Sequence, residues 1–367
     1  MDASAVCLRA CLDAVPDQRH HNRVYPLTDV LLMALFATLA GAEHFTDFEE
    51  YCTLRLAWFK DNLGVQHVPS HDTFAAVFRT VDYRSFECAL RSWTCHLLQD
   101  SVFGPPDIVS LDGKALNGAQ DYANIVSAWS ANHGLTLGGV ATEGAKQNEL
   151  QAMVTRVSQL RLKGAVVTAD AAGTYAALAD AVCAKGGDYV LPVKGNQGNT
   201  LETVKLCFDV PFAPWNTVRT LDKTGGRVEE RTYEVLPVGK RALPFTEKWQ
   251  KLAAVARVTS VVTRQDKVTT TQRFYITSLT DTDLFARAVR AHWGVENGLH
   301  WQLDVVFRED DCPARDANAQ KNLNTLRKLV HNTLKKRGAG KSIRSERKRA
   351  GWSEDYFDTL TGAFLKR

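Results

Sequence analysis

The chain has 367 residues, a formal net charge of +4, 45% hydrophobic and 23% charged residues, which excludes a disordered protein and indicates one large α/β domain with smaller helical parts. Its eight cysteines form no Cys-x-x-Cys pair and show no usual zinc spacing, so they indicate reduced thiols in a cytosolic protein and argue against a structural zinc site. The apolar run 30–42 is too short to cross a bilayer and is predicted to be a buried helix, which argues against a membrane partner.

Residues 1–100 are predicted to be helical. Thr46 and Glu49 have the spacing of a capping box, and Gly64 is expected to end the helix that follows. Asp82 is expected to cap a later helix with apolar residues at helical spacing. Short helices joined by tight turns form either a DNA-binding module of the helix-turn-helix kind or a packed bundle, and the pattern leaves both open.

From Asp107 the pattern changes to strands. Three β-rich runs are followed by a helix from about Asn148 to Leu160, a buried strand, a second helix and a further strand, DYVLPVKGN. This order is characteristic of a ribonuclease H-like α/β fold, a mixed sheet flanked by helices, in which the first and fourth strands lie side by side. We therefore predict a catalytic domain over 101–310, with a β-rich insertion at about 211–279 and a long helix beginning at Asp281.

Three carboxylates have positions that suggest chemistry. Asp112 and Asp170 each follow an apolar strand, and Glu296 lies in an amphipathic helical segment flanked by tryptophans. Each also has an ordinary interpretation: a turn residue before Gly113 for Asp112, a helix N-cap for Asp170 and a solvated helical charge for Glu296. Together they are expected to converge, because a hard divalent cation needs several oxygen ligands and clustered carboxylates repel one another without one.

The C-terminal part, 311–367, is predicted to be a basic helical region. Residues 315–349 carry twelve Lys and Arg against Asp316 and Glu346, a net charge of +10, so the remainder of the chain carries −6. A basic stripe on an otherwise acidic chain indicates a polyanionic partner, although a solvated helix with a basic tail has the same composition. The residues expected to contact DNA here are Lys335, Lys336, Arg337, Arg347, Lys348 and Arg349.

Several motifs are similar to those of one known family. They are SLDGKALNG, VTADAAG, VLPVKGNQGN, RFYITSL and, most specifically, HWGVENGLHWQLDVVFREDD, followed by KNLNTLRKLVHNTLKK and RKRAGW. Together these motifs resemble bacterial insertion-sequence transposases of the DDE superfamily, in the group that includes the H-repeat-associated proteins of Rhs elements. The resemblance extends from about Arg23 almost to the C-terminus.

The resemblance implies a catalytic triad of Asp112, Asp170 and Glu296 that binds two Mg²⁺ ions, which Mn²⁺ can replace. Such ions stand roughly 3.5–4 Å apart, one activating the attacking oxygen and the other stabilising the leaving one. Asp112 would bridge both ions, and each of the other two carboxylates would hold mainly one. The implied reaction uses water to cut the transposon end and then joins the 3′-hydroxyl to target DNA.

Other residues are expected to support this chemistry. Lys194, at the end of a strand, is predicted either to touch a DNA phosphate or to lie in a surface turn. His292, Glu296, His300 and Asp304 recur every four residues and so share one helical stripe. We expect the two histidines to support the active site or face DNA. A zinc hydrolase is the rival interpretation, which the lack of an HExxH motif disfavours.

One departure from the wider family concerns the catalytic helix. Wider relatives carry an arginine four residues before the glutamate and a lysine seven after it, and here these positions are His292 and Leu303. Arg290 is a candidate replacement for the arginine. Trp293 and Trp301 are predicted to pack in the core, the functional alternative being stacking on an unpaired base.

The resulting hypothesis is a DNA transposase acting on double-stranded DNA, as a homodimer when two ends are paired, in the bacterial cytoplasm and associated with the nucleoid. Two alternatives share the fold: a catalytically silent or domesticated relative that only binds DNA, and a ribonuclease H-like nuclease.

Overall fold

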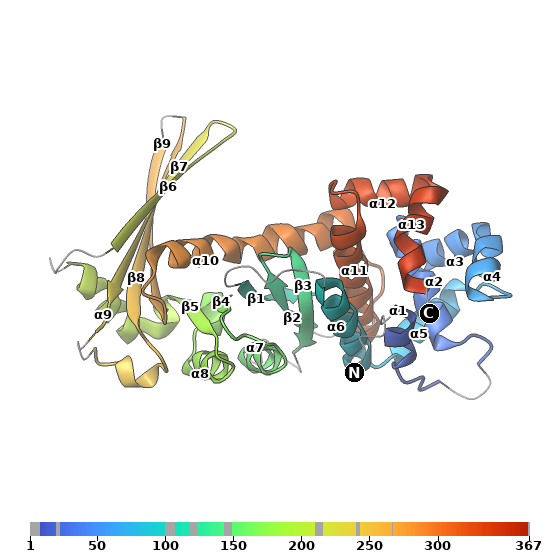
Figure 1. Ribbon diagram of the computed structural model, residues 1–367, viewed down its shortest axis with the longest axis horizontal. Helices are drawn as coiled ribbons and strands as arrows, with labels where there is room; N and C mark the ends of the chain where they lie inside the picture. Colours follow the sequence, from blue (N-terminus) through green and yellow to red (C-terminus); the bar gives the residue numbers. More distant parts are fainter. Residues whose placement is uncertain are drawn as a thin grey trace.

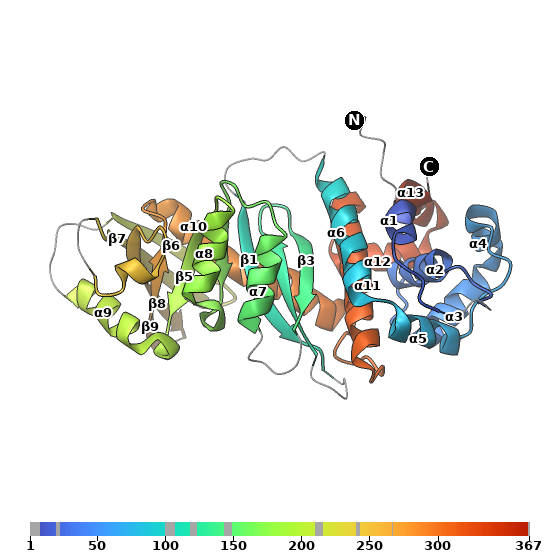
Figure 2. The same cartoon turned by 90° about the horizontal axis from the view of Figure 1, so that it is seen from below.

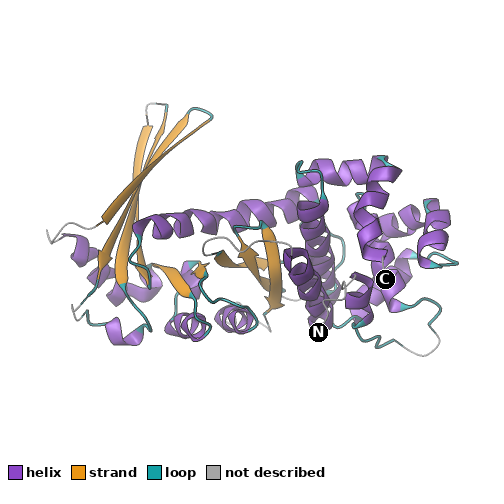
Figure 3. Ribbon diagram, in the orientation of Figure 1, coloured by secondary structure: helices purple, strands orange, loops and turns teal. Residues whose placement is uncertain are grey.

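The computed structural model describes residues 8–19, 23–99, 107–117, 123–142, 149–209, 216–239, 243–265 and 267–365. The helix start predicted at about Asn148 lies outside these ranges. The two ends of the chain form a helical part, and the middle forms a sheet with flanking helices (Figure 3). The predicted α/β class with a mixed sheet is confirmed.

The helical part combines the first and the last helices of the chain. From the N-terminal side come α1 (Leu8–Asp13), α2 (Leu27–Leu39), α3 (Phe45–Leu54), α4 (Leu56–Leu63), α5 (His71–Thr80) and α6 (Tyr83–Gln99), and from the C-terminal side α11 (Ala317–Arg337), α12 (Ile343–Trp352) and α13 (Glu354–Leu365). One hydrophobic core joins both sets, with α2 buried on every side. None of the helices in the described ranges combines the length and apolarity needed to cross a bilayer.

The capping box predicted at Thr46 and Glu49 is wrong by two positions. Helix α3 begins at Phe45, and the Asp47 carboxylate accepts hydrogen bonds from the backbone N–H groups of Glu43 and His44, at 2.9 and 3.0 Å. The helix also breaks at residue 55 into α3 and α4. Its predicted end is confirmed, since Gly64 adopts φ +72°, which favours glycine.

The sheet has nine strands in the order β3-β2-β1-β4-β5-β9-β8-β7-β6. The strands are β1 (Ile108–Ala115), β2 (Asn124–Ser130), β3 (Leu135–Ala141), β4 (Val166–Ala169), β5 (Asp188–Val193), β6 (Asn216–Thr224), β7 (Arg227–Pro237), β8 (Ala254–Arg264) and β9 (Lys267–Thr277). Strand β1 pairs in parallel with β4, as predicted, and β4 pairs in parallel with β5. The other neighbours are antiparallel, so the sheet is mixed.

Helices cover both faces of the sheet (Figure 2). On one face lie α7 (Glu149–Ser158), α8 (Ala176–Ala184) and α9 (Gly198–Asp209), around a core with Met153, Leu178 and Val204. On the other lies α10 (Thr282–Val295), which buries Phe285 and Val289 against the strands. Figure 1 shows α10 running along the sheet towards α11, so this helix connects the sheet with the helical part.

The region predicted as a β-rich insertion continues the main sheet. The last residues of β9 pair with β5, from Phe274 with Val193 to Thr277 with Val190, because the backbone groups on that side of β5 would otherwise lie unpaired. The opposite ends of β6 to β9 project beyond the helices (Figure 1), and those of β6 and β9 are largely exposed.

Candidate active site

Asp112 and Asp170 lie on neighbouring parallel strands. The register pairs Leu111 with Ala169, so the two aspartates come next in line, on strands that stand about 5 Å apart. Asp112 belongs to β1, which runs on to Ala115, so its interpretation as a turn residue is wrong. Asp170 does act as an N-cap: its Oδ1 accepts from the Gly173 N–H at 3.0 Å, at the start of a short 3₁₀ turn.

Glu296 comes from the other side of the sheet. It stands where α10 gives way to two π-helical turns, Glu296–His300 and Gln302–Val306. Such turns interrupt helices frequently at functional sites. Asp170 and Glu296 both line a pocket of about 180 Å³, which also includes Lys194, Arg273, His292 and Trp293.

Two glycines allow this helix to approach the sheet. A Cβ atom on Gly298 would lie 2.6 Å from Cζ2 of the buried Trp129 on β2, and one on Gly294 would lie 3.5 Å from its Nε1. A side chain at residue 298 would therefore push the helix away from the strand. Gly298 sets the close approach that holds Glu296 near the two aspartates.

The three carboxylates affect one another electrostatically. Burial raises the pKa of Asp112 to about 7, and the negative charges of Asp170 and Glu296 add to the effect, against the Gly113 N–H, which lowers it. That N–H donates to Asp112 Oδ1 at 3.0 Å. Asp112 therefore binds a proton near neutral pH, which is expected for a carboxylate placed where a cation would replace the proton.

The donor set fits Mg²⁺ in chemistry, since all three side chains offer hard carboxylate oxygens. The mutual repulsion at Asp112 also fits, because a divalent ion relieves it. Within the described ranges, however, no three His, Cys, Asp or Glu side chains gather closely enough to hold a metal ion by themselves.

His292 is held by a chain of hydroxyls. Ser110 Oγ donates to the Ala291 carbonyl at 3.4 Å, Thr168 Oγ1 donates to Ser110 at 3.1 Å, and His292 Nδ1 lies 3.0 Å from Thr168. Because the Thr168 proton is already used, His292 must donate from Nδ1, which leaves Nε2 as an acceptor. Burial lowers the pKa of His292, which favours the neutral ring.

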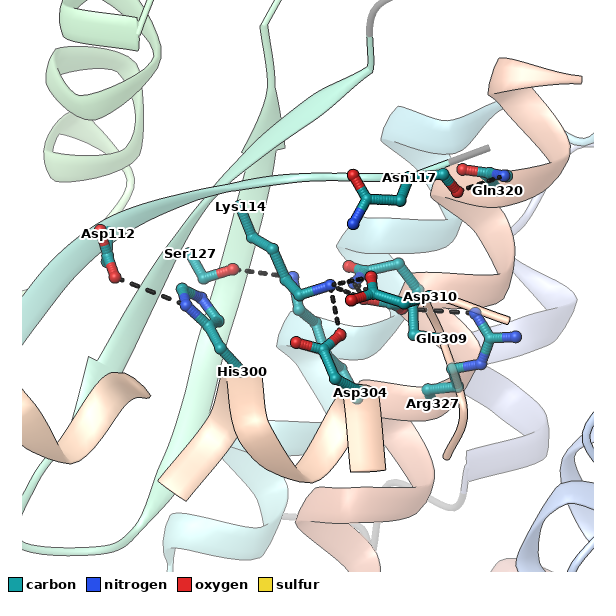
Figure 4. Close-up of polar contacts among 12 residues, drawn as sticks. Asp112, Lys114, Asn117, Ser127, His300, Asp304, Glu309, Asp310, Gln320 and Arg327 are labelled. Carbon is teal, nitrogen blue, oxygen red and sulfur yellow. Dashed lines mark hydrogen bonds and ion pairs between the residues drawn. The ribbon is translucent and has the colours of Figure 1, made fainter. Parts of the chain in front are cut away.

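His300 lies beside Asp112, with its Nδ1 3.4 Å from Asp112 Oδ2 (Figure 4). Burial lowers the pKa of His300 to about 3, with help from Lys328 and Lys114, so the contact joins a neutral imidazole to the carboxyl group. His300 Nε2 is buried and has no hydrogen-bond partner among the described residues. The ring thus lies buried against Asp112.

Lys114 forms a second contact between the same strand and helix. Its Nζ lies 2.6 Å from Asp304, 3.0 Å from Glu309 and 3.3 Å from Asp310 (Figure 4). Glu309 in turn accepts from Arg327 on α11 at 3.3 Å. Burial lowers the pKa of Lys114, but Glu309 and Asp304 raise it further, so it stays charged. This cluster was not anticipated, although Lys114 lies in the SLDGKALNG motif.

The arginine that lines this pocket is not the one expected from the sequence. Arg290 lies 3.2 Å from Asp222 on β6 and is absent from the residues that line this pocket. Arg273 of the RFYITSL motif lines it instead, with its guanidinium 5.2 Å from the Trp293 ring centroid. Lys194, at the end of β5, lines the same pocket.

The predicted burial of Trp293 and Trp301 is wrong. Their side chains are 43% and 50% exposed. Trp293 flanks the pocket that holds Glu296.

The basic C-terminal residues divide into exposed and buried ones. Lys335, Lys336 and Lys348 are exposed, and Arg337 and Arg349 are half-buried over the rings of Trp93 and Tyr356. The expected DNA contact of Arg347 is wrong, because its guanidinium is buried and donates to the carbonyls of Thr38, Ala42 and Val306. Arg327 and Lys328 of the same basic segment are also buried.

Two family models match the chain. The model described as transposase DDE domain matches residues 107–333, which include the three carboxylates and most of α11. The model described as DDE_Tnp_1-associated matches residues 9–94 in the helical part.

Several bacterial relatives are similar along most of their length. The putative protein YbfL and the H repeat-associated putative transposase YhhI, both from Escherichia coli K12, are each 31% identical over 374 residues, covering 96% of this chain and 97% of the relative. The putative transposase YncI of Escherichia coli O157:H7 is 32% identical and covers 88% of this chain and 86% of its own. The similarity thus includes both the helical part and the sheet.

Proposed function

The chain belongs to the family of proteins with a transposase DDE domain, and on that basis we propose that it cuts the ends of an insertion sequence and joins them to target DNA. Asp112, Asp170 and Glu296 are the proposed catalytic residues. The observation that carries this assignment is the placement of carboxylates from distant chain segments: Asp112 and Asp170 follow paired residues of β1 and β4, and Glu296 lines the same pocket as Asp170.

Mg²⁺, or Mn²⁺ in its place, is the proposed cofactor, held by these three carboxylates as two ions. When bound, it would activate an attacking oxygen and stabilise the leaving one. Asp112 would bind the cation as the carboxylate, and His300, 3.4 Å from its Oδ2, would keep the group oriented. Lys194 and Arg273 supply positive charge in the same pocket for a DNA phosphate. Water is the first nucleophile, and the freed 3′-hydroxyl is the second.

The proposed partner is double-stranded DNA, with two copies of the chain acting together when two ends are paired, in the bacterial cytoplasm. Two other functions use the same fold. A silent relative would bind DNA without cutting it, and a ribonuclease H-like nuclease would cut without joining. The presence of all three carboxylates favours an active enzyme over the silent relative.

Cleavage of the chain's own element ends tests the proposal. Wild-type protein is incubated with Mg²⁺ and a duplex that carries the terminal repeats flanking its gene, beside Asp112→Ala, Asp170→Ala and Glu296→Ala. Each variant is expected to lose about 10³-fold in cleavage rate, the equivalent of several kcal/mol of transition-state stabilisation. Asp180→Ala, an exposed carboxylate on α8, is the matched control and should cut normally.

Three outcomes contradict parts of this proposal. Equal cleavage by all the variants would remove the triad assignment. Cleavage without joined products would favour the nuclease, and binding without cleavage by the wild type would favour the silent relative. As a readout independent of activity, Mg²⁺ should raise the melting temperature of the wild type more than that of the triad variants.

A further inference from the structure

A groove of about 530 Å³ lies on the helical part, away from the carboxylates. It is formed between the C-terminal end of α2, the end of the second π-helical turn and α12. Its walls carry Glu43, Arg308, Arg344, Lys348 and Trp352, and Arg347 lies in its floor.

The groove is strongly cationic. Arg344 and Lys348 are both exposed and stand four residues apart on α12, so they lie on one face of that helix. Among the described residues neither has a carboxylate within ion-pair distance. Arg308 on the facing wall lies 3.6 Å from Glu43 and 2.9 Å from Asp311, so the acidic side chains there are already paired.

The floor of the groove is fixed in shape. Arg347 Nε donates to the Thr38 carbonyl at 3.1 Å and one terminal nitrogen to the Ala42 carbonyl at 3.1 Å, while the other donates to Val306. These bonds tie α12 to the end of α2 and to the last π-helical turn. The Arg344 and Lys348 side chains therefore project from a rigid frame, which reduces the entropy lost when they bind a ligand.

An exposed aromatic ring completes the groove. Trp352 is 77% exposed, and Lys348 Nζ lies 5.8 Å from its ring centroid. A tryptophan this exposed contributes little to folding. Its indole N–H donates hydrogen bonds and accepts none, so it can bind a phosphate oxygen, which accepts them.

The groove continues the helix that carries Glu296. Val305, which lines the groove, comes nine residues after Glu296 on the same helical run, so the groove and the candidate active site share one structural element.

We propose that this groove binds the phosphate backbone of duplex DNA at a distance from the candidate active site, through Arg344, Lys348 and Trp352. The identity of the polyanion rests on the proposed function. Only Lys348 of these was expected from the sequence to contact DNA. The contact would hold the duplex without reading its sequence, because phosphates carry no base information.

The test measures binding alone. A random-sequence duplex with a fluorescent label is titrated, without Mg²⁺, with wild type and with the double variant Arg344→Ala/Lys348→Ala, over a series of salt concentrations. Loss of two phosphate contacts should weaken binding and reduce the slope of log K against log salt by about 1.8. Trp352→Ala should weaken binding with little change in slope.

The double variant Arg161→Ala/Lys163→Ala is the matched control. It removes the same two charges from exposed positions before β4, and should change the slope far less than the groove variant. Equal slopes in the two double variants, unchanged binding by the groove variant, or no duplex binding by the wild type would each overturn the proposal. Failure of the proposed function appears differently, as wild-type protein that binds duplex DNA and does not cut it.

Discussion

Lys114 Nζ lies 2.6 Å from Asp304 Oδ1, and two residues earlier on the same strand Asp112 Oδ2 lies 3.4 Å from His300 Nδ1. The strand residues are two apart and the helix residues four apart, so both contacts join one short stretch of β1 to the two π-helical turns. Together they fix the register of the helix that carries Glu296 against the strand that carries Asp112.

Lys114→Met should destabilise the protein. It removes the cation that lies between Asp304 and Glu309, and Glu309 is buried, so a charge would be left with only Arg327 as its ionic partner. Breaking a buried pair from one side costs about 3 kcal/mol. Urea denaturation measures the free energy of unfolding, with the exposed Lys163→Met as a control. A loss below about 0.5 kcal/mol would show that the cluster does not hold the two elements together.

Asp112→Asn should stabilise the protein at high pH. The folded-state pKa of Asp112, about 7, lies above its ordinary value of 3.8, so protonation favours the fold below pH 4 and that contribution is lost as the pH rises through about 7. At pH 8 the variant should be about 2–4 kcal/mol more stable than the wild type, with little difference at pH 4. The free energy of unfolding is measured at both values without divalent ions. A constant difference would contradict the raised pKa.

Gly298→Ala should weaken the packing of the helix on β2. Its new methyl group would meet Cζ2 of Trp129 at 2.6 Å, and overpacking of this kind costs about 1–3 kcal/mol. Gly362→Ala is the matched control, since Gly362 lies in α13 with open space around its Cβ position. That variant should be neutral or slightly stabilising. Equal thermal unfolding of the two variants would mean that Trp129 does not limit the approach.

Arg347→Lys should lower stability and leave the salt dependence of DNA binding unchanged. A lysine cannot reach the three carbonyls of Thr38, Ala42 and Val306 together, and unsatisfied buried groups cost about 1–3 kcal/mol. Lys348→Ala, one residue along and exposed, should show the opposite: a stability change within about 0.5 kcal/mol and a smaller salt slope. Denaturation and anisotropy titrations on both variants check this contrast.

Local patterns along the chain were enough to predict much of the sheet. The parallel pairing of β1 with β4, which brings Asp112 next to Asp170, follows from the order of strands and helices. The end of α4 at Gly64 and the cap of α10 at Asp281 were equally readable, because each depends on neighbouring backbone atoms only. The β-rich region was recognised as strands, but its junction with β5 was not, since strand partners far apart in sequence leave no local signal.

The sequence by itself determined the class of the fold, the approximate place of each strand and the three carboxylates, because apolar periodicity and residue type are local properties. Only the tertiary structure decided which charges are buried and which are free. Arg347, Lys348 and Arg349 are adjacent in one basic run, yet the first lies in the core and the second faces solvent. Lys114 acquires its role from Asp304, 190 residues later, through a contact that exists only when the strand and the helix pack together.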